Sequence, residues 1–268
     1  MTIRIGAHIA QDDPIAEAKA RDTTLVQFFL GDPQGYKGPE VRYAGGAEGL
    51  RADAEAAGID LYVHAPYIVN VATTNNRIRI PSRKLLQQHV DAAAEIGAKG
   101  LIVHGGHVSG AGDDAELIAK GFDNWRKAVE ATDLKVPVLI ENTAGGDNAM
   151  TRHLERIAGV WDAIGAAEGA DQVGFCLDTC HAWASGIALA DAVEQIRAVT
   201  GRIDLVHAND SRDAFGSGAD RHTSFGRGQI PEDELAGVVR DAGVPVICET
   251  PGGPAEHMAD FAWLRERI

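Results

Sequence analysis

The chain has 268 residues, 45% of them apolar, and a formal net charge of −14 at pH 7. This length supports one large α/β domain with a sizeable core, and no apolar run reaches the ~20 residues of a membrane span, so we expect no membrane partner. The negative charge argues against a nucleic-acid partner, which is bound through Lys and Arg, unless bound cations reverse the local sign.

The cysteine and N-terminal patterns indicate the compartment. Cys176, Cys180 and Cys248 lie in apolar strand-like segments or at strand ends, which favours free thiols in a reducing compartment over a disulfide framework. Residues 1–6 lack the basic-then-apolar pattern of a signal peptide. We therefore expect a cytoplasmic protein.

Short β-branched runs alternate with alanine-rich amphipathic stretches along the chain. Ser82 is a plausible N-cap, and Gly58 and Gly97 are plausible helix stops. Strands are expected at residues 3–9, 24–30, 59–63, 100–103, 136–140, 173–177, 203–206 and 244–248. Helices are expected at residues 14–21, 44–57, 82–96, 115–131, 150–167, 189–199, 232–242 and 255–266.

The number and size of these repeats predict the architecture. Eight βα units of roughly 33 residues are typical of a (β/α)8 TIM barrel. A doubly wound open sheet is the competing architecture, but no Gly-x-Gly-x-x-Gly turn follows the first strand. We therefore expect a single TIM-barrel domain over residues 1–268.

A potential metal ligand follows each of six successive strand runs, at intervals of 29 to 42 residues, which is about one βα unit. In a TIM barrel these strand ends converge on one mouth, where active sites lie. Three bare carboxylates there would repel one another, and divalent ions remove that conflict. Mixed nitrogen and oxygen ligands suit zinc, manganese or iron. The six residues are His64, His104, Glu141, Asp178, His207 and Glu249.

Further candidate ligands lie in the loops after the sixth and seventh strands. His181 follows Asp178 by three residues, although Asp178 by itself could simply cap a helix. Asp220 and His222 are two residues apart, so in an extended loop both side chains would face one ion. Nine candidate ligands are too many for one metal and adequate for two or three.

These residues lie in motifs that together resemble those of the endonuclease IV family of abasic-site endonucleases, from residue 6 to residue 251. The motifs are His64-Ala-Pro-Tyr67, His104 with a glycine pair and His107, Glu141-Asn-Thr-Ala-Gly145, Asp178-Thr-Cys-His181, His207-Ala-Asn-Asp-Ser211, Asp220-Arg-His222 and Glu249-Thr250.

The resemblance implies hydrolysis of the phosphodiester on the 5′ side of an abasic site in double-stranded DNA, leaving a 3′-hydroxyl and a 5′-deoxyribose phosphate. It implies three zinc ions, for which manganese is an expected substitute, and a bridging hydroxide as nucleophile. No obligate protein partner is expected. By this resemblance His64 and His104 hold the first ion, Glu141 bridges it to a second held by Asp178, His207 and Glu249, and His181, Asp220 and His222 hold the third. Glu141 and Glu249 are the expected catalytic residues.

Candidate DNA contacts surround the ligands. Tyr67 could stack on a base, with ordinary packing as the alternative. The loop at residues 31–40 probes DNA in the family, but here it offers Gln34 and Tyr36 instead of the family's usual Asn-x-Arg-x-Trp-like run. Arg77 belongs to a basic stretch at residues 75–84 that could be a phosphate-facing loop leading into a helix or a solvated face, and Arg227 lies in the turn after His222.

The remaining histidines are not expected to bind metal. His8 and His107 are expected to lie around the ligands without binding metal. We expect His89, His153 and His257, which fall in helical segments, to lie on the surface.

Two other functions compete. A xylose-isomerase-like sugar isomerase or epimerase with one divalent ion would use Glu141, Asp178, His207 and Glu249, but it leaves five candidate ligands without a shared purpose. A non-catalytic DNA- or partner-binding barrel with structural metals is the third possibility.

Overall fold

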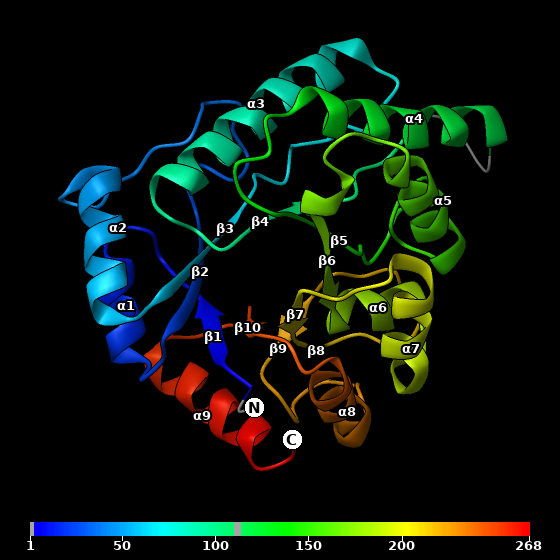
Figure 1. The fold of residues 1–268 in the computed structure, drawn as a ribbon. Helices are drawn as coiled ribbons and strands as arrows, with labels where there is room; N and C mark the ends of the chain where they lie inside the picture. Colours follow the sequence, from blue (N-terminus) through cyan, green and yellow to red (C-terminus); the bar gives the residue numbers. More distant parts are fainter. Residues whose placement is uncertain (1–2, 110–113) are drawn as a thin grey trace.

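Parallel strands close into a barrel in the order β1-β10-β7-β6-β5-β4-β3-β2, and helices surround it (Figure 1). The structure, a computed structural model, describes residues 3–109 and 114–268. Neighbouring strands pair in parallel register all the way round, including β1 with both β10 and β2. The predicted (β/α)8 TIM barrel is confirmed.

The barrel strands are short, and a helix follows each of them. The strands are β1 (Ile5–His8), β2 (Leu25–Phe29), β3 (Asp60–His64), β4 (Leu101–His104), β5 (Val138–Glu141), β6 (Val173–Asp178), β7 (Leu205–Ala208) and β10 (Val246–Cys248). The helices are α1 (Pro14–Ala20), α2 (Gly46–Ala57), α3 (Asn76–Glu95), α4 (Ala115–Ala131), α5 (Leu154–Gly165), α6 (Thr179–Ser185), α7 (Leu189–Thr200), α8 (Glu232–Ala242) and α9 (Pro254–Arg265).

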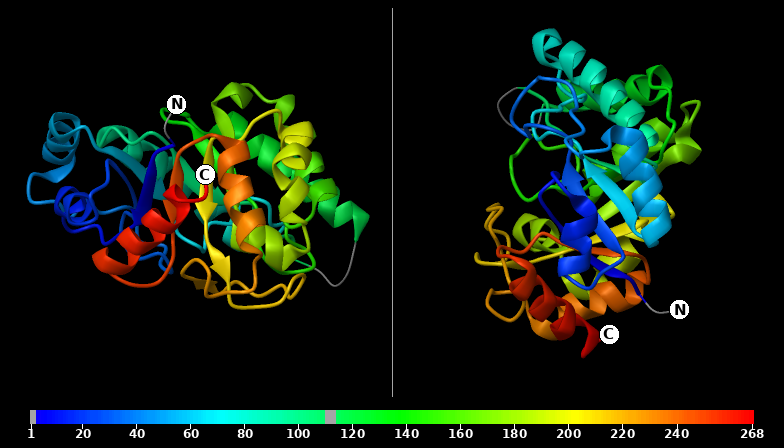
Figure 2. Two further views of the ribbon diagram at one scale, coloured as in Figure 1. Left: turned by 90° about the horizontal axis from the view of Figure 1, so that it is seen from below. Right: turned by 90° about the vertical axis from the view of Figure 1, so that its left-hand side faces the viewer.

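A long segment between β7 and α8 carries a small antiparallel pair, β8 (Asp210–Ser211) with β9 (His222–Thr223). This segment projects from the end of the barrel to which the strands point (Figure 2, left). It therefore lies over the mouth at which the strand C-termini converge. Within the described part of the chain, no helix combines the length and the apolar character needed to cross a membrane.

The core has two parts. The larger part fills the space between the strands and the surrounding helices. A smaller part fills the interior of the barrel, with one residue from each of seven strands: Leu25, Tyr62, Ile102, Leu139, Cys176, Leu205 and Ile247. This inner core closes the barrel below the mouth, so the mouth is not the entrance to a pore.

Two predicted helix starts are wrong. Helix α3 begins at Asn76, because the Asn75 side chain accepts a hydrogen bond from the backbone N–H of Arg77 and caps it there. The helix continues through Pro81, and the Ser82 hydroxyl accepts from the N–H of Asn70. Arg77 thus lies in the first turn of a helix and not in a loop.

Helix α5 begins at Leu154 and not at residue 150. The reason is that Met150 is wholly buried and its backbone N–H donates to the carbonyl of Gly106 at 2.9 Å. This contact holds residue 150 in the loop that follows β5. The stops at Gly58 and Gly97 are confirmed, since both residues adopt positive φ angles of 66° and 70°.

The predicted surface positions of His89 and His257 are also wrong. His89 is wholly buried on the inner face of α3, where its Nδ1 lies 2.9 Å from the Leu85 carbonyl. His257 is 3% exposed, accepts from Arg21 Nε at 2.8 Å and donates from Nε2 to the Thr250 carbonyl. The helical period alone did not indicate that these two imidazoles face the barrel.

Candidate metal centre

The register of the inner-core residues determines which side chains of the strands face the mouth. Side chains two residues apart on a strand point the same way, so each residue two positions beyond an inner-core member also faces the barrel axis. On six strands that position holds a predicted ligand, and on β2 it holds Gln27. The resulting layer consists of Gln27, His64, His104, Glu141, Asp178, His207 and Glu249.

Glu141 occupies the middle of this layer and is wholly buried. Its Oε2 lies 3.2 Å from Nε2 of His64 and 3.2 Å from Nε2 of His104, and its Oε1 lies 3.0 Å from Nδ1 of His207. Burial opposes ionisation of this carboxyl, but His207, His104 and His181 together hold the pKa of Glu141 well below its ordinary value. The carboxylate is therefore available as a ligand on both of its sides.

Two groups of potential ligand atoms share Glu141. The first consists of His64, His104 and Glu141, and in each group the ligand atoms lie within 4.8 Å of one another. The second consists of Glu141, Asp178, His207 and Glu249. Burial also opposes ionisation of Glu249, yet His207 and His8 hold the pKa of Glu249 far below its usual range. These groups coincide with the sets proposed for the first and second ions.

His181 of α6 and the loop residues Asp220 and His222 lie beside the first two groups. Asp220 Oδ2 lies 3.2 Å from Nε2 of His181, and Asp220 Oδ1 lies 3.0 Å from Nε2 of His222. The β8–β9 pairing opposes Ser211 to His222 and so holds the loop over the mouth. The structure also brings together two overlapping sets here, Asp178 with His181 and His222, and Cys180 with Asp220 and His222.

Asp178 has the capping role as well as a place in the cluster. Its Oδ1 accepts from the backbone N–H of His181 at 2.7 Å and so caps α6, which places His181 on a helix rather than in a loop. Its Oδ2 accepts from Nδ2 of Asn209 at 2.7 Å. Burial raises the pKa of Asp178, so a nearby cation would stabilise its ionised form.

The imidazoles are oriented as metal ligands require. Nδ1 of His64 lies 2.7 Å from the Ala65 carbonyl, and Nδ1 of His181 lies 2.9 Å from the Asn142 carbonyl. Because a carbonyl accepts only, each Nδ1 carries the proton, and the lone pair of each Nε2 is left for a cation bound between it and the nearby carboxylate. Nε2 of His222 is buried 3.0 Å from Asp220 but makes no hydrogen bond to the described residues. This nitrogen and oxygen donor set fits zinc.

Three polar residues that form hydrogen bonds with the candidate metal ligands were not predicted from the sequence. Asn209 accepts at Oδ1 from the N–H of Glu249 while donating to Asp178. Asn142 exchanges two hydrogen bonds with the backbone of Asp178. Gln27 contacts His207 and Glu249. The two asparagines lie within the motifs already singled out, and Gln27 has the same two-residue offset from the inner core as the ligands.

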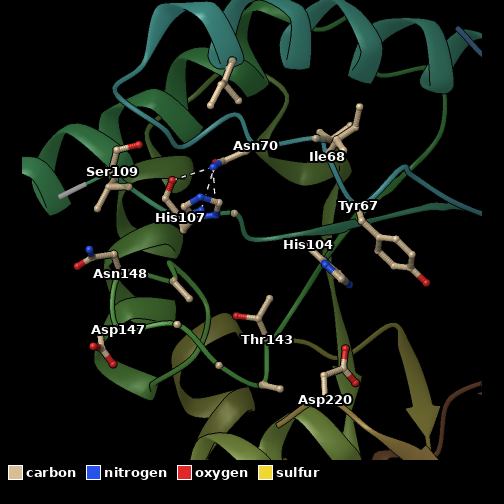
Figure 3. Close-up of a pocket in the computed structure, with 18 of the residues that line it drawn as sticks. Tyr67, Ile68, Asn70, His104, His107, Ser109, Thr143, Asp147, Asn148 and Asp220 are labelled. Carbon is tan, nitrogen blue, oxygen red and sulfur yellow. Dashed lines mark hydrogen bonds between the residues drawn. The ribbon is translucent and has the colours of Figure 1, made fainter. Parts of the chain in front are cut away.

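A cavity of about 710 Å³ opens beside the centre and is lined by His104, His181 and Asp220 among others. Figure 3 shows Tyr67, His104 and Asp220 along one side of it and Ser109, Asp147 and Asn148 along the other, with His107 held by Asn70. Tyr36 and Tyr67, both about half exposed, also line this cavity.

The other predicted DNA contacts lie further out. Gln34, Arg77 and Arg227 are exposed and do not line this cavity, although Ile78, the neighbour of Arg77, does.

His8 lies against the centre, with Nδ1 3.4 Å from Glu249 Oε1. Phe225, in the same turn as Arg227, is buried and stacks on Trp263.

A barrel whose mouth gathers five imidazoles and four carboxylates defines a TIM barrel with a candidate polynuclear metal centre. A family model described as Xylose isomerase-like TIM barrel matches residues 15–267. The chain is 53% identical over 263 residues to "Probable endonuclease 4" of Mycobacterium bovis (strain BCG / Pasteur 1173P2), with 98% of each chain covered. It is 52% identical over 264 residues to the protein of the same name from Mycobacterium marinum, again with 98% coverage of each.

Two solved structures share the fold of this chain. Endonuclease IV from Thermus thermophilus superposes with a TM-score of 0.81 at 28% identity, covering 98% of this chain and 99% of that one. A D-tagatose 3-epimerase-like protein shares the fold, with a TM-score of 0.80 at 18% identity over 99% of this chain and 97% of that one. The chain belongs to the endonuclease IV family of the xylose-isomerase-like TIM barrels. The assignment made from the motifs is thus confirmed.

Proposed function

We propose that this protein is a DNA-repair endonuclease that hydrolyses the phosphodiester 5′ to an abasic site, leaving a 3′-hydroxyl and a 5′-deoxyribose phosphate. One observation carries the proposal: the mouth holds three adjoining groups of ligand atoms around Glu141, Asp178 and Asp220. Family membership supports the same reaction class. The expected cytoplasmic location is part of this proposal.

Nine side chains of this chain would hold three zinc ions. His64 and His104 would hold the first, Glu141 would contribute to both the first and the second, and helix α6 together with the β8–β9 loop would hold the third. Zinc ions bound in this way make a water nucleophilic at neutral pH and stabilise charge on the leaving oxygen. The remaining ligands of the second ion are Asp178, His207 and Glu249, and those of the third are His181, Asp220 and His222.

The residues of the mouth also orient the substrate. Four carboxylates and three Zn²⁺ give a local charge of +2, so a phosphodiester is attracted to the mouth of an otherwise acidic chain. Tyr67 stands beside the imidazoles of His64 and His104, with ring centroids 5.7 Å and 5.6 Å away. Its half-exposed ring would stack on DNA at the lesion, and the adjacent cavity would receive the displaced sugar.

A sugar isomerase or epimerase is the alternative, because an epimerase-like protein shares the fold. That chemistry needs one divalent ion and only the group around Glu141, Asp178, His207 and Glu249. His64, His104, His181, Asp220 and His222 would then converge on the mouth without a common role. Near three zinc ions per chain supports the nuclease, and one exchangeable manganese contradicts it.

The decisive test is incubation of the zinc-loaded protein with an end-labelled duplex that carries one abasic site. We expect a single cut on the 5′ side of the lesion, with a 3′-hydroxyl that a polymerase extends. The same duplex with an intact base is the control for lesion dependence. Binding of the abasic duplex without cutting would instead support a non-catalytic binding barrel and overturn the proposal.

A further inference from the structure

Gln27 lies inside β2 and is wholly buried, two residues beyond Leu25 of the inner core. It therefore points into the mouth at the position that six other strands fill with candidate ligands. In the strand run Leu25–Phe29 it is the one polar residue among apolar neighbours. A buried amide has to be hydrogen-bonded, so its partners indicate what it does.

Two of the three hydrogen-bond partners of Gln27 are assigned to the same ion. Its Oε1 lies 2.8 Å from Nε2 of His207, and its Nε2 lies 2.6 Å from Oε1 of Glu249 and 3.0 Å from Nδ1 of His8. An amide oxygen only accepts and an amide nitrogen only donates. Nε2 of His207 therefore carries a proton, while Glu249 and His8 accept the two amide protons.

The contact with Glu249 fixes the orientation of the Gln27 amide. Turning the amide over would place its oxygen 2.6 Å from a carboxylate oxygen, two acceptors with no proton between them. With the amide held in its present orientation, His207 must donate from Nε2. Its Nδ1, which lies 3.0 Å from Glu141 and 3.5 Å from Glu249, then has a lone pair for a cation bound between it and these carboxylates.

We propose that Gln27 is a positioning residue that couples two ligands of one zinc ion: it holds His207 in the Nε2–H tautomer and Glu249 in a single orientation. This inference rests on the proposed function, because it assumes the zinc centre at the mouth. The outer nitrogens of His64 and His181 are held by backbone carbonyls, which no substitution removes. His207 depends on a side chain instead, so its orientation can be tested by substitution.

The test compares the full-length protein with Gln27→Met, which keeps the side-chain length and removes both amide groups. Zinc content is measured after dialysis against graded chelator concentrations, and unfolding temperature is measured with and without zinc. We expect one ion per chain to bind about 10- to 100-fold more weakly, the usual effect of losing an outer hydrogen-bond partner. The zinc-free protein should unfold close to the parent temperature, because Met fills the same space.

Gln172→Met is the matched control, since Gln172 is exposed and precedes β6 at the opposite end of the barrel. It should bind zinc like the parent. Parent-like zinc affinity in Gln27→Met overturns the inference. An equal loss of unfolding temperature with and without zinc also overturns it, because that outcome marks a packing role alone. A parent that holds zinc but leaves abasic DNA uncut refutes the proposed function, and the zinc comparison still decides the role of Gln27. A parent that binds no zinc overturns both.

Discussion

Oε1 of Glu141 lies 3.0 Å from Nδ1 of His207, on the side of the carboxylate opposite to the imidazoles of His64 and His104. One buried carboxylate thus contacts imidazoles from three other strands. Glu141 belongs to two different groups of candidate ligand atoms, so it is the residue that would bridge two ions.

Glu141→Gln should lower abasic-site cleavage by at least about 100-fold, the upper range for loss of a partner that only orients a ligand. The amide keeps the size of the side chain but replaces one anionic oxygen by N–H donors, which face imidazole nitrogens and cannot bind an ion. Cleavage is measured under single-turnover conditions. Glu266→Gln, at an exposed position near the C-terminus, is the control. Cleavage at the parent rate would show that Glu141 does not bridge.

Prolonged chelation should abolish cleavage and weaken DNA binding together. Without ions the mouth presents the carboxylates of Glu141, Asp178, Asp220 and Glu249 to a polyanion, so the affinity for DNA should fall. Added zinc should restore both properties, and manganese should restore them in part. Calcium, which prefers all-oxygen ligands, should not. Fluorescence anisotropy with an uncleavable abasic analogue measures binding, and unchanged affinity after complete removal of metal would contradict the proposed centre.

Asp178→Asn and His181→Ala should remove different ions. Asn retains the N-cap of α6, so the helix that carries His181 is preserved in the first variant. Each variant should lose about one zinc per chain, and the double variant about two. The measurement is metal content after gel filtration. If the double variant loses no more zinc than either single variant, the two residues serve the same ion.

Tyr67→Ala should weaken binding of abasic duplex about 10-fold, whereas Tyr67→Phe should bind nearly as the parent does, because stacking on a base contributes about 1–3 kcal/mol and needs only the ring. Tyr67 is 52% exposed and packs edge-on against Phe29, so the ring is held in place by its neighbours. Zinc content should be unchanged in both variants. Parent-like affinity in Tyr67→Ala would mean that the ring only packs against the imidazoles.

Acid should destabilise the fold partly through His89. Burial lowers the pKa of His89 below the ordinary value of 6.5. The unfolded chain therefore binds a proton at this site that the folded chain does not, and the free energy of unfolding falls as the pH drops below 6.5. Between about pH 7.5 and about pH 5.5, His89→Leu should lose less stability than the parent. Urea unfolding in chelator at both pH values tests this, and equal losses would contradict a neutral buried His89.

The positions of the candidate ligands were predictable because a (β/α)8 chain delivers one strand end to the mouth at nearly regular intervals. His64, His104, Glu141, Asp178, His207 and Glu249 each end an apolar run, so the parallel topology alone brings them together. The spacing of Asp220 and His222 likewise indicated a shared target, and their side chains do meet.

The residues that orient those ligands were not predictable in the same way. Gln27 lies in mid-strand, and only the inner-core register shows that it faces the mouth rather than the helices. His89 and His257 looked like surface residues, since helical spacing does not tell which face a neighbouring element will cover.

The sequence by itself determined the fold class, the family and the set of candidate ligands, because all three follow from local runs and from motifs at the strand ends. The tertiary structure decided which imidazole nitrogen faces the carboxylates and which side chains hold each ligand. Those facts depend on hydrogen bonds between residues far apart in the chain, such as the one from His207 to Gln27 across 180 positions. Only the closed barrel brings such partners within reach.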